Sequence, residues 1–160
     1  MSAKAQASVV FRPAQRDELQ EIVRLLAEDS LGRQREATEG ELPASYVEAF
    51  DAIEADNGSE VLVAAAEERV VGVMQLTVIP NLTYRGSRRA LVEGVRVSPE
   101  LRGQGVGERF MRWAIERARE RGCRMVQLTT NRAREDAQRF YERLGFEPSH
   151  VGMKLHLDDA

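Results

Sequence analysis

The sequence predicts an α/β domain of the α+β type, in which four helices flank a largely antiparallel sheet. Three observations carry this prediction: apolar runs of strand length, segments with helical apolar spacing, and three consecutive strand-like runs joined by polar turns. The 160 residues, 42% of them hydrophobic and 31% charged, are enough to form a core. We therefore expect a single domain over residues 1–160.

The N-terminal part of the chain predicts one strand and two helices. The run Val9–Arg12 predicts a short strand that stops at Pro13, since proline lacks the N–H of a ladder. Apolar residues at helical spacing predict helices over 16–29 and 44–56. The polar stretch 30–41 between them predicts a loop.

The middle of the chain predicts a three-stranded meander. A buried run over 61–66 leads through a turn at 67–69 into a second run over 70–79. The polar segment 80–87 predicts a hairpin loop, and 88–97 returns as the third strand. Neighbouring strands joined this way run antiparallel.

The C-terminal part predicts alternating helices and strands. A long helix over 105–121 carries one apolar stripe, and Gly122 suits its C-terminal end. A strand over 124–129, a short helix over 135–144 and a last strand over 151–157 follow. The chain therefore has the order β-α-α-β-β-β-α-β-α-β.

Charge is distributed unevenly along the chain. Residues 1–80 hold 15 Asp and Glu against 7 Lys and Arg, whereas residues 81–160 hold 11 against 16. A basic C-terminal half suits a partner that carries several phosphates. We do not expect nucleic acid, because the arginines form no single run and no stacking set of aromatic residues accompanies them.

Composition also bears on compartment and on metals. No apolar run approaches the ~20 residues that span a bilayer, and the N-terminus shows no apolar segment typical of a secretory signal. We therefore expect a cytoplasmic protein without membrane contact. Cys123 is the single cysteine, which excludes a disulfide framework and a cysteine-based zinc site; no metal is expected.

A glycine-rich turn before the helix at 105–121 is the strongest functional signal. The N–H groups of such a turn, with the positive end of the helix behind them, bind anions. A P-loop is excluded because no Gly-Lys-Ser/Thr ends the turn. In a dinucleotide-binding turn the third glycine would fall on Glu108. The spacing that fits is Arg-x-x-Gly-x-Gly, at Arg102, Gly105 and Gly107.

A second motif, Ala137–Phe146, reads A-x-x-F-Y-x-x-x-G-F and begins thirty residues after Gly107. With both motifs in this order, residues 60–157 resemble the GCN5-related N-acetyltransferase (GNAT) family. The family's acetyl-coenzyme A signature is Gln/Arg-x-x-Gly-x-Gly/Ala. The resemblance implies a mixed, mostly antiparallel sheet of about six to seven strands, with a central V-shaped splay and four flanking helices.

The resemblance implies acetyl-coenzyme A as the acetyl donor, and it implies where this molecule binds. The backbone of Val95 and Val97 would hold the pantetheine arm, with the Val95 N–H directed at the thioester oxygen. Asn131 is the candidate for a family asparagine whose usual position is Arg134 here. The remaining residues implied for this site are Arg102, Gly103, Gln104, Gly105, Val106 and Gly107 for the pyrophosphate, with Ala137 and Phe140 from the second motif.

Two residues are candidates for the proton transfers that acetylation of an amine requires. Tyr141 matches the family tyrosine beside the sulfur, and a phenol with a pKa of about 10 can protonate the departing thiolate. Glu93 interrupts an apolar run, and simple alternation places it on the same face as Val95 and Val97. It would take the proton from the amine or bind the amine as its counterion; the structural alternative is an ion pair with Arg88 or Arg96.

The acceptor is left open by the sequence. The leading hypothesis is direct acetyl transfer, through a tetrahedral intermediate, to the primary amine of a small molecule. The alternatives are a protein N-terminal or lysine acetyltransferase and a module that binds acyl-coenzyme A without turnover. His150 could reach the acceptor, whereas His156 and Cys123 fit packed or surface positions better. The last strand would be an edge strand, which makes a homodimer a further hypothesis.

Overall fold

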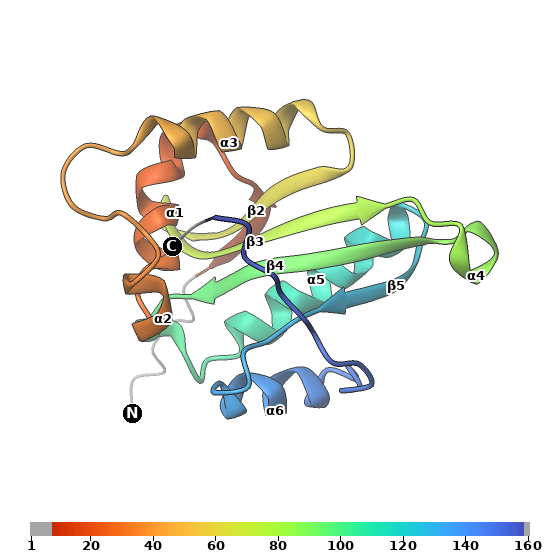
Figure 1. Ribbon diagram of the computed structural model, residues 1–160. Helices are drawn as coiled ribbons and strands as arrows, with labels where there is room; N and C mark the ends of the chain where they lie inside the picture. The colour runs from red at the N-terminus through yellow and green to blue at the C-terminus, as the bar shows by residue number, and fades with distance from the viewer. Residues whose placement is uncertain (1–7, 159–160) are drawn as a thin grey trace, which may run out of the picture. The chain divides into compact units, whose positions relative to one another are not determined.

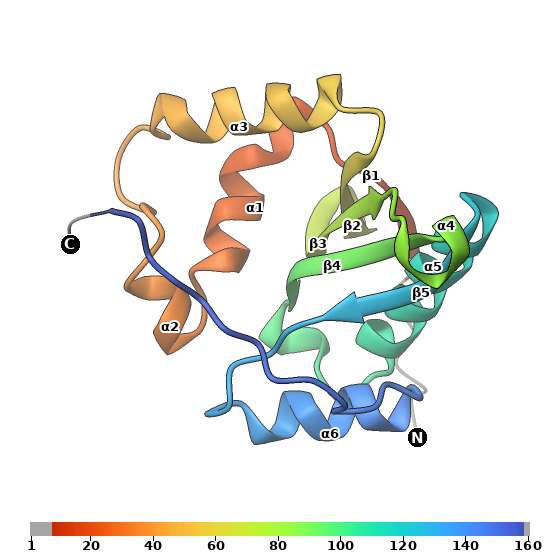
Figure 2. The ribbon, with the colours of Figure 1, turned by 45° about the vertical axis from the view of Figure 1, so that its right-hand side comes forward.

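A computed structural model describes residues 8–158 and divides them into two compact units (Figure 1). The first unit ends at Gln127 and the second begins at Leu128. The first holds the sheet and its covering helices, and the second holds one helix and the C-terminal segment (Figures 1 and 2).

The sheet has five strands in the order β1-β2-β3-β4-β5. These are β1 (Val9–Pro13), β2 (Ser59–Ala66), β3 (Arg69–Ile79), β4 (Arg88–Val97) and β5 (Cys123–Leu128). The first four pair antiparallel, and the pairing of β2, β3 and β4 confirms the predicted meander. The arrow of β5 points the same way as that of its neighbour β4, so the sheet is mixed (Figure 1). Pro13 is tolerated at the end of β1 because β1 is an edge strand.

The helices match the predicted ones with small shifts at their ends. The first predicted helix divides into a 3₁₀ turn, η1 (Arg16–Glu18), and α1 (Leu19–Leu26). The others are α3 (Ala44–Ala55), α5 (Val106–Glu120) and α6 (Glu135–Arg143). The two predicted loops contain single turns, α2 (Ser30–Arg33) and α4 (Thr83–Gly86), and η2 (Pro99–Leu101) follows β4.

One face of the sheet packs on α5 (Figure 2). Phe110 of α5 is fully buried, and its ring stacks on Phe11 of β1 at a centroid distance of 5.2 Å. Gly72 makes this packing possible, since a Cβ there would lie 3.0 Å from the Ala64 Cβ and 3.5 Å from the Phe110 ring. Burial of such a side chain stabilises the fold by ~2 kcal/mol.

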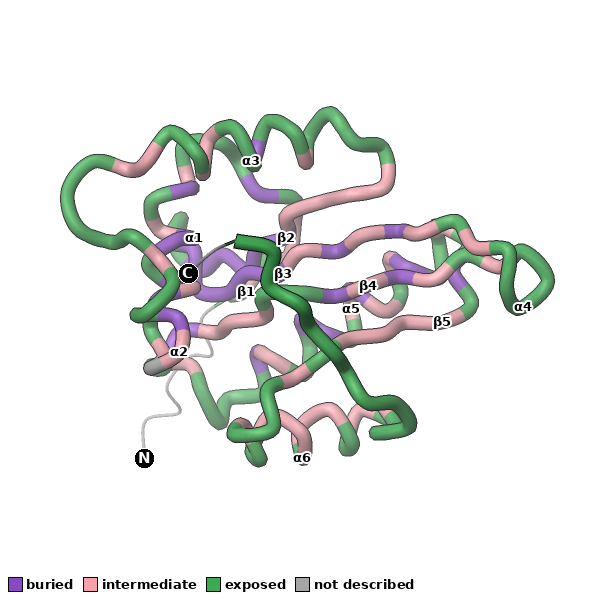
Figure 3. The backbone as a smooth tube through the Cα atoms, viewed as in Figure 1, coloured by how far each residue is buried: buried purple, intermediate pink, exposed green. Residues whose placement is uncertain are grey.

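The other face packs on α1 and α3 (Figure 2). Ile22 of α1 and Phe50 of α3 join Val63 and Val73 of the sheet in one buried cluster. The apolar positions 19, 22, 23, 25 and 26 lie on one side of the helix, as helical spacing predicts. Because this cluster centres on the β2–β3 region around Val63, Val70 and Val73, the far ends of β3 and β4 are less completely covered on this face (Figure 3).

An ion pair connects α5 to β2. Arg117 donates to Glu60 through Nε at 2.7 Å and Nη2 at 2.6 Å, and Arg121 approaches the same carboxylate at 3.4 Å. The hydrogen bonds from Arg117 lower the pKa of Glu60 below its ordinary value. A bidentate pair of this kind also fixes the orientation of the helix relative to the strand.

A β-bulge interrupts β4. Glu93 pairs with Gln75 and Arg96 with Val73, so Gly94 and Val95 together stand opposite Met74 alone. Gly94 has a φ of +60°, a left-handed conformation that glycine adopts without steric cost. A glycine in this conformation as the first residue of a bulge is a known arrangement, and it twists the strand locally.

The second unit contains α6, which ends in a complete Schellman motif. The Phe146 N–H donates to the Tyr141 carbonyl and the Gly145 N–H to the Glu142 carbonyl, both at 3.0 Å. Gly145 has a φ of +96°, which ends the helix. The Phe146 ring then meets the Tyr141 ring edge-on at 5.7 Å. The Gly-Phe of the second motif therefore has a local physical purpose.

The predicted strand over 151–157 is wrong, since the described structure assigns no strand there. The sheet has five strands rather than the six to seven expected. The alternating sequence gives the segment a strand-like pattern, but a strand also needs a partner. Gly152 approaches the Thr129 side chain, just beyond the point at which β5 ends at Leu128.

Candidate active site

The turn between β4 and α5 leaves some of its N–H groups open. Within it, the Leu101 N–H donates to Ser98, the Arg102 N–H to Pro99, and the Gln104 N–H to Leu101. In the described part of the chain, no acceptor meets the N–H of Gly103 or of Gly105. These two glycines have φ values of +74° and +75°. Their positive φ values, rather than crowding, explain why glycine is needed.

Helix α5 begins with its positive end uncovered. Gly105 is the N-cap, and no side chain caps it. The N–H groups of Val106, Gly107 and Glu108 lie in the first turn, where no intrahelical acceptor exists. The predicted pyrophosphate residues Arg102 to Gly107 thus form one turn, but only some of their amides are available. Arg102 and Gln104 use theirs internally.

The bulge places Val95 at an irregular point of β4. Val95 and Gly94 share one opposing residue, so the ladder with β3 is interrupted there. Val97 resumes regular pairing, with Gly72. Sequence reasoning did not use Gly94, although a glycine inside an apolar strand is a signal for a bulge.

The bulge also corrects the predicted position of Glu93. Across an antiparallel pair, opposite residues point to the same face. Glu93 pairs with Gln75 and Arg96 with Val73, so both lie on the face that packs on α1. Val97 pairs with Gly72 and lies on the α5 face. The expectation that Glu93 and Val97 share a face is wrong, because the extra residue reverses the alternation.

The Glu93 side chain is exposed, and it makes no hydrogen bond or ion pair with any described residue. The structural alternative was a pair with Arg88 or Arg96. Arg88 instead donates to the Arg121 carbonyl, and Arg96 pairs with Asp29. An unpaired carboxylate beside a backbone bulge can accept a proton from, or bind, a cationic group that approaches this face.

Arg96 and Asp29 support the bulge; the sequence suggested Arg96 only as a partner of Glu93, and it did not single out Asp29. Arg96 Nη1 donates to the Val95 carbonyl at 2.8 Å, and Nη2 lies 3.5 Å from Asp29 Oδ2. Asp29 also accepts the Gly32 N–H and so caps α2. Both side chains are largely buried. Through them, the connection between α1 and α2 is tied to the irregular part of β4.

The second motif forms one stripe of α6. Ala137, Phe140 and Tyr141 are half-buried, and the Tyr141 ring packs edge-on against both Phe140 and Phe146. Asn131 precedes the helix, and its side-chain oxygen accepts the Ala133 N–H at 2.9 Å. This bond gives Asn131 a local turn-forming role and leaves its amide N–H₂ group for other partners.

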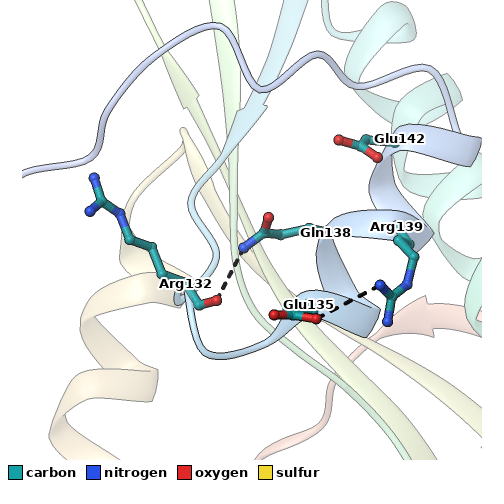
Figure 4. A pocket seen from close by; sticks show the side chains of 5 residues that line it. All are labelled: Arg132, Glu135, Gln138, Arg139 and Glu142. Carbon is teal, nitrogen blue, oxygen red and sulfur yellow. Dashed lines mark hydrogen bonds and ion pairs between the residues drawn. The ribbon is translucent and has the colours of Figure 1, made fainter.

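The opposite stripe of α6 borders a shallow polar depression (Figure 4). Its charges are compensated within the helix, since Arg139 pairs with both Glu135 and Asp136. Gln138 reaches back to the Arg132 carbonyl, as the dashed line in Figure 4 marks. None of the residues that line it belongs to the predicted site; they are Arg132, Glu135, Gln138, Arg139 and Glu142.

The remaining candidates offer less chemistry. Cys123 is buried at the start of β5, and desolvation raises the pKa of its thiol, which disfavours the thiolate that a nucleophile needs. His150 is exposed, with its Nδ1 2.7 Å from the Ser149 hydroxyl. His156 is exposed in the C-terminal segment.

Comparison with known proteins connects these features. The model of the acetyltransferase (GNAT) family matches residues 19–146, which include both motifs and the bulged strand. The chain belongs to the GNAT acetyltransferase family. The mixed sheet, with its glycine-rich turn and the following helix, is therefore a GNAT fold.

Several relatives of this GNAT chain are known. It is 40% identical over 81 residues to an aminoalkylphosphonate N-acetyltransferase from Salmonella typhimurium, a match that covers 51% of this chain and 52% of that one. It is 35% identical over 89 residues to a glucosamine 6-phosphate N-acetyltransferase from Trypanosoma brucei brucei, covering 56% and 58%. The alignments thus span little more than half the length of these curated relatives.

A solved structure resembles the GNAT chain over nearly its whole length. It is described as a transcriptional regulator from Bacillus halodurans, with 51% sequence identity and a TM-score of 0.91. The match covers 94% of this chain and 100% of the other. Of the helices in residues 8–158, none combines the length and the apolar character needed to cross a bilayer.

Proposed function

We propose that this protein transfers the acetyl group of acetyl-coenzyme A to the primary amine of a small molecule. The observation that carries the proposal is that two features lie at the two ends of the segment from Gly94 to the start of α5. The bulge at Gly94 and Val95 lies at its start, and the uncapped N-terminus of α5 lies at its end. The first suits a thioester and the second a diphosphate.

The residues present fit the coenzyme A portion of the donor. A Cβ placed on Gly103 or Gly105 would meet no described atom within 4 Å, apart from the adjoining residues, so the turn has room for a ligand. The open amides of Gly103, Gly105 and the first turn of α5 would hold the pyrophosphate. The Arg102 side chain is exposed beside them and can add a charge-assisted bond.

Acetyl-coenzyme A supplies the activated acetyl group as a thioester. The bulged backbone at Val95 would place an N–H where negative charge develops on the thioester oxygen, which lowers the barrier to attack. Arg96 Nη1 donates to the Val95 carbonyl at 2.8 Å, and this hydrogen bond restrains the peptide group that follows Val95. A fixed donor is worth more than a mobile one, because no reorganisation is needed during the reaction.

Two side chains would handle the protons. The amine nitrogen forms a bond to the carbonyl carbon, and the proton that it loses passes to Glu93, directly or through water. The bond between that carbon and sulfur breaks, and Tyr141 protonates the departing thiolate. The products are the N-acetylated amine and coenzyme A, and the two residues return to their starting states by exchanging protons with solvent.

The names of the relatives support a small-molecule acceptor. The proteins from Salmonella and Trypanosoma are named for the acetylation of aminoalkylphosphonates and of glucosamine 6-phosphate. The Bacillus halodurans protein is described as a transcriptional regulator, which favours as a second candidate a module that binds acyl-coenzyme A without turnover. Both candidates require donor binding, but only the first requires Tyr141 and Glu93.

Two glycines that flank α5 give a matched test of donor binding. Gly105 and Gly122 stand at opposite ends of the helix, have φ values of +75° and +79°, and face open space. Alanine at either position strains the backbone by a similar ~1 kcal/mol. We expect Gly105→Ala to weaken acetyl-coenzyme A binding about tenfold in calorimetric titration, because it disturbs the amides at the N-cap. Gly122→Ala should bind as the wild type does, and equal affinity in all three proteins contradicts the assigned pyrophosphate position.

A further inference from the structure

The face of β4 that carries Glu93 continues into a partly uncovered strip of the sheet. We name this the acceptor strip, defined as Gln75, Thr77 and Ile79 of β3 with Arg89, Leu91 and Glu93 of β4. The pairing is regular from Glu93 with Gln75 to Arg89 with Ile79, so all six side chains share one face. All are half-buried except Glu93, which is exposed. Their neighbours on the other face, such as Ala90 and Val92, are buried.

Arg89 lies at the end of the acceptor strip opposite Glu93. The two positions are four residues apart on one strand, a distance of ~13 Å between the Cα atoms. Arg89 is half-buried, which limits the water available to solvate its charge. A basic group at one end and an acidic group at the other give the strip two charged ends.

The guanidinium of Arg89 is held in place by neutral groups. Its Nη1 donates to Gln127 Oε1 at 2.9 Å and its Nη2 to Thr83 Oγ1 at 3.1 Å. Among the described residues, no carboxylate forms an ion pair with it. These two bonds orient the fork but do not neutralise it, and within residues 8–158 the other N–H groups of the fork have no hydrogen-bond partner.

The sequence around Arg89 keeps this charge uncompensated. No Asp or Glu occurs from Arg69 through Val92, whereas Arg85, Arg88 and Arg89 cluster at the start of β4. Two other half-buried arginines have acidic partners: Arg12 has Glu18, and Arg117 has Glu60. Arg89 therefore differs from them in being oriented without a counterion.

Building on the proposed function, we propose that the acceptor is an amine that also carries an anionic group, and that Arg89 binds this anion. The amine lies at Glu93, beside the bulge, and the anion lies at the other end of the acceptor strip. Leu91 and the aliphatic part of Thr77 form the floor between them. A planar fork binds phosphate, phosphonate or carboxylate through paired hydrogen bonds.

The test compares acceptors that differ only in the anion. Thiol release is measured with 3-aminopropylphosphonate, with its carboxylate analogue 4-aminobutyrate, and with propylamine. We expect the wild type to favour one or both anionic amines in kcat/KM. Arg89→Gln should remove ~10–100-fold of that preference and leave turnover of propylamine within about threefold. The anionic amine that loses more identifies whether the site takes a phosphonate or a carboxylate.

Arg88→Gln is the matched control, because Arg88 is the adjacent arginine and points to the opposite face. It should leave the preference unchanged. Arg89→Lys keeps the charge without the fork and should retain part of the preference. A uniform loss with all three amines in Arg89→Gln, with a lower melting temperature, overturns the proposal and assigns Arg89 a structural role only.

Direct titration separates this proposal from the proposed function. 3-Aminopropylphosphonate is titrated calorimetrically into wild type and Arg89→Gln saturated with coenzyme A. If the wild type binds 3-aminopropylphosphonate and Arg89→Gln does not, the anion site is supported. This holds even if no amine is turned over, because that result contradicts only the transfer reaction. Turnover of propylamine without any effect of Arg89→Gln on the anionic amines supports the transfer reaction and overturns the anion site.

Discussion

The two faces of β4 differ in how completely they are covered. On one face Ala90 and Val92 are buried under α5, with at most 2% of their surface exposed. On the other, Arg89 and Leu91 are only half-buried, and Glu93 is exposed. The same ten-residue strand therefore contributes to the core on one side and offers charged, accessible groups on the other.

The difference shows how a single added residue can connect a core to a site. Up to Glu93 the strand alternates regularly between the two faces. The bulge at Gly94 and Val95 then exchanges the faces, so that Arg96 follows Glu93 on the α1 side and Val97 returns to the α5 side. The interrupted ladder is where the proposed function requires free backbone groups.

Among substitutions on the two faces of β4, Glu93→Gln is expected to have the largest effect. We expect kcat for the amine to fall by ~10²-fold or more, since a base contributes 10²–10⁴-fold. The melting temperature should not change, because the Glu93 side chain is exposed and forms no hydrogen bond or ion pair with any described residue. Initial rates from pH 5 to pH 10 measure both the loss and the shape of the profile.

The split between kcat and KM distinguishes a base from a counterion. If Glu93 takes the proton, the glutamine variant loses kcat at every pH tested. If it only binds the cationic amine, KM rises and kcat is retained. A variant with unchanged kcat, KM and profile contradicts the assignment of function to the uncovered face.

A smaller effect is expected from shortening the buried face. Val92→Ala removes buried methyl groups beneath α5 and should reduce the free energy of unfolding by ~2 kcal/mol. Leu91→Ala, one residue away on the half-buried face, should cost less than ~1 kcal/mol. Denaturant titration of both variants measures the two values. Equal losses would contradict the difference in coverage between the faces.

Much of the fold could be predicted from local patterns. The meander, the helix after the glycine turn and the helix of the second motif depend on contacts near in sequence, and their predicted ends lie within two residues of the observed ones. The strand over 151–157 could not be predicted in this way. Its residues do alternate as in a strand, but a strand also needs a neighbouring strand to pair with. A local sequence pattern does not show whether such a partner lies beside it.

The candidate site shows the same limit. Gly105 and Gly145, which belong to the two sequence motifs, each coincide with a feature that local backbone physics explains: an open helix start and a Schellman end. The face of Glu93 was predicted wrongly because regular alternation was assumed across Gly94. The roles of Arg96 and Asp29 depend on a contact between positions 67 residues apart in the chain, which no local pattern signals.

The most direct test of the central claim is amine-dependent release of the coenzyme A thiol by the wild type and by Tyr141→Phe. The phenylalanine keeps the ring contacts with Phe140 and Phe146 but removes the proposed proton donor. We predict release that requires an amine, and a kcat lower by ~10²-fold in the variant at unchanged acetyl-coenzyme A affinity. Tight binding of acetyl-coenzyme A without release on any amine, or equal rates in the two proteins, would contradict the account.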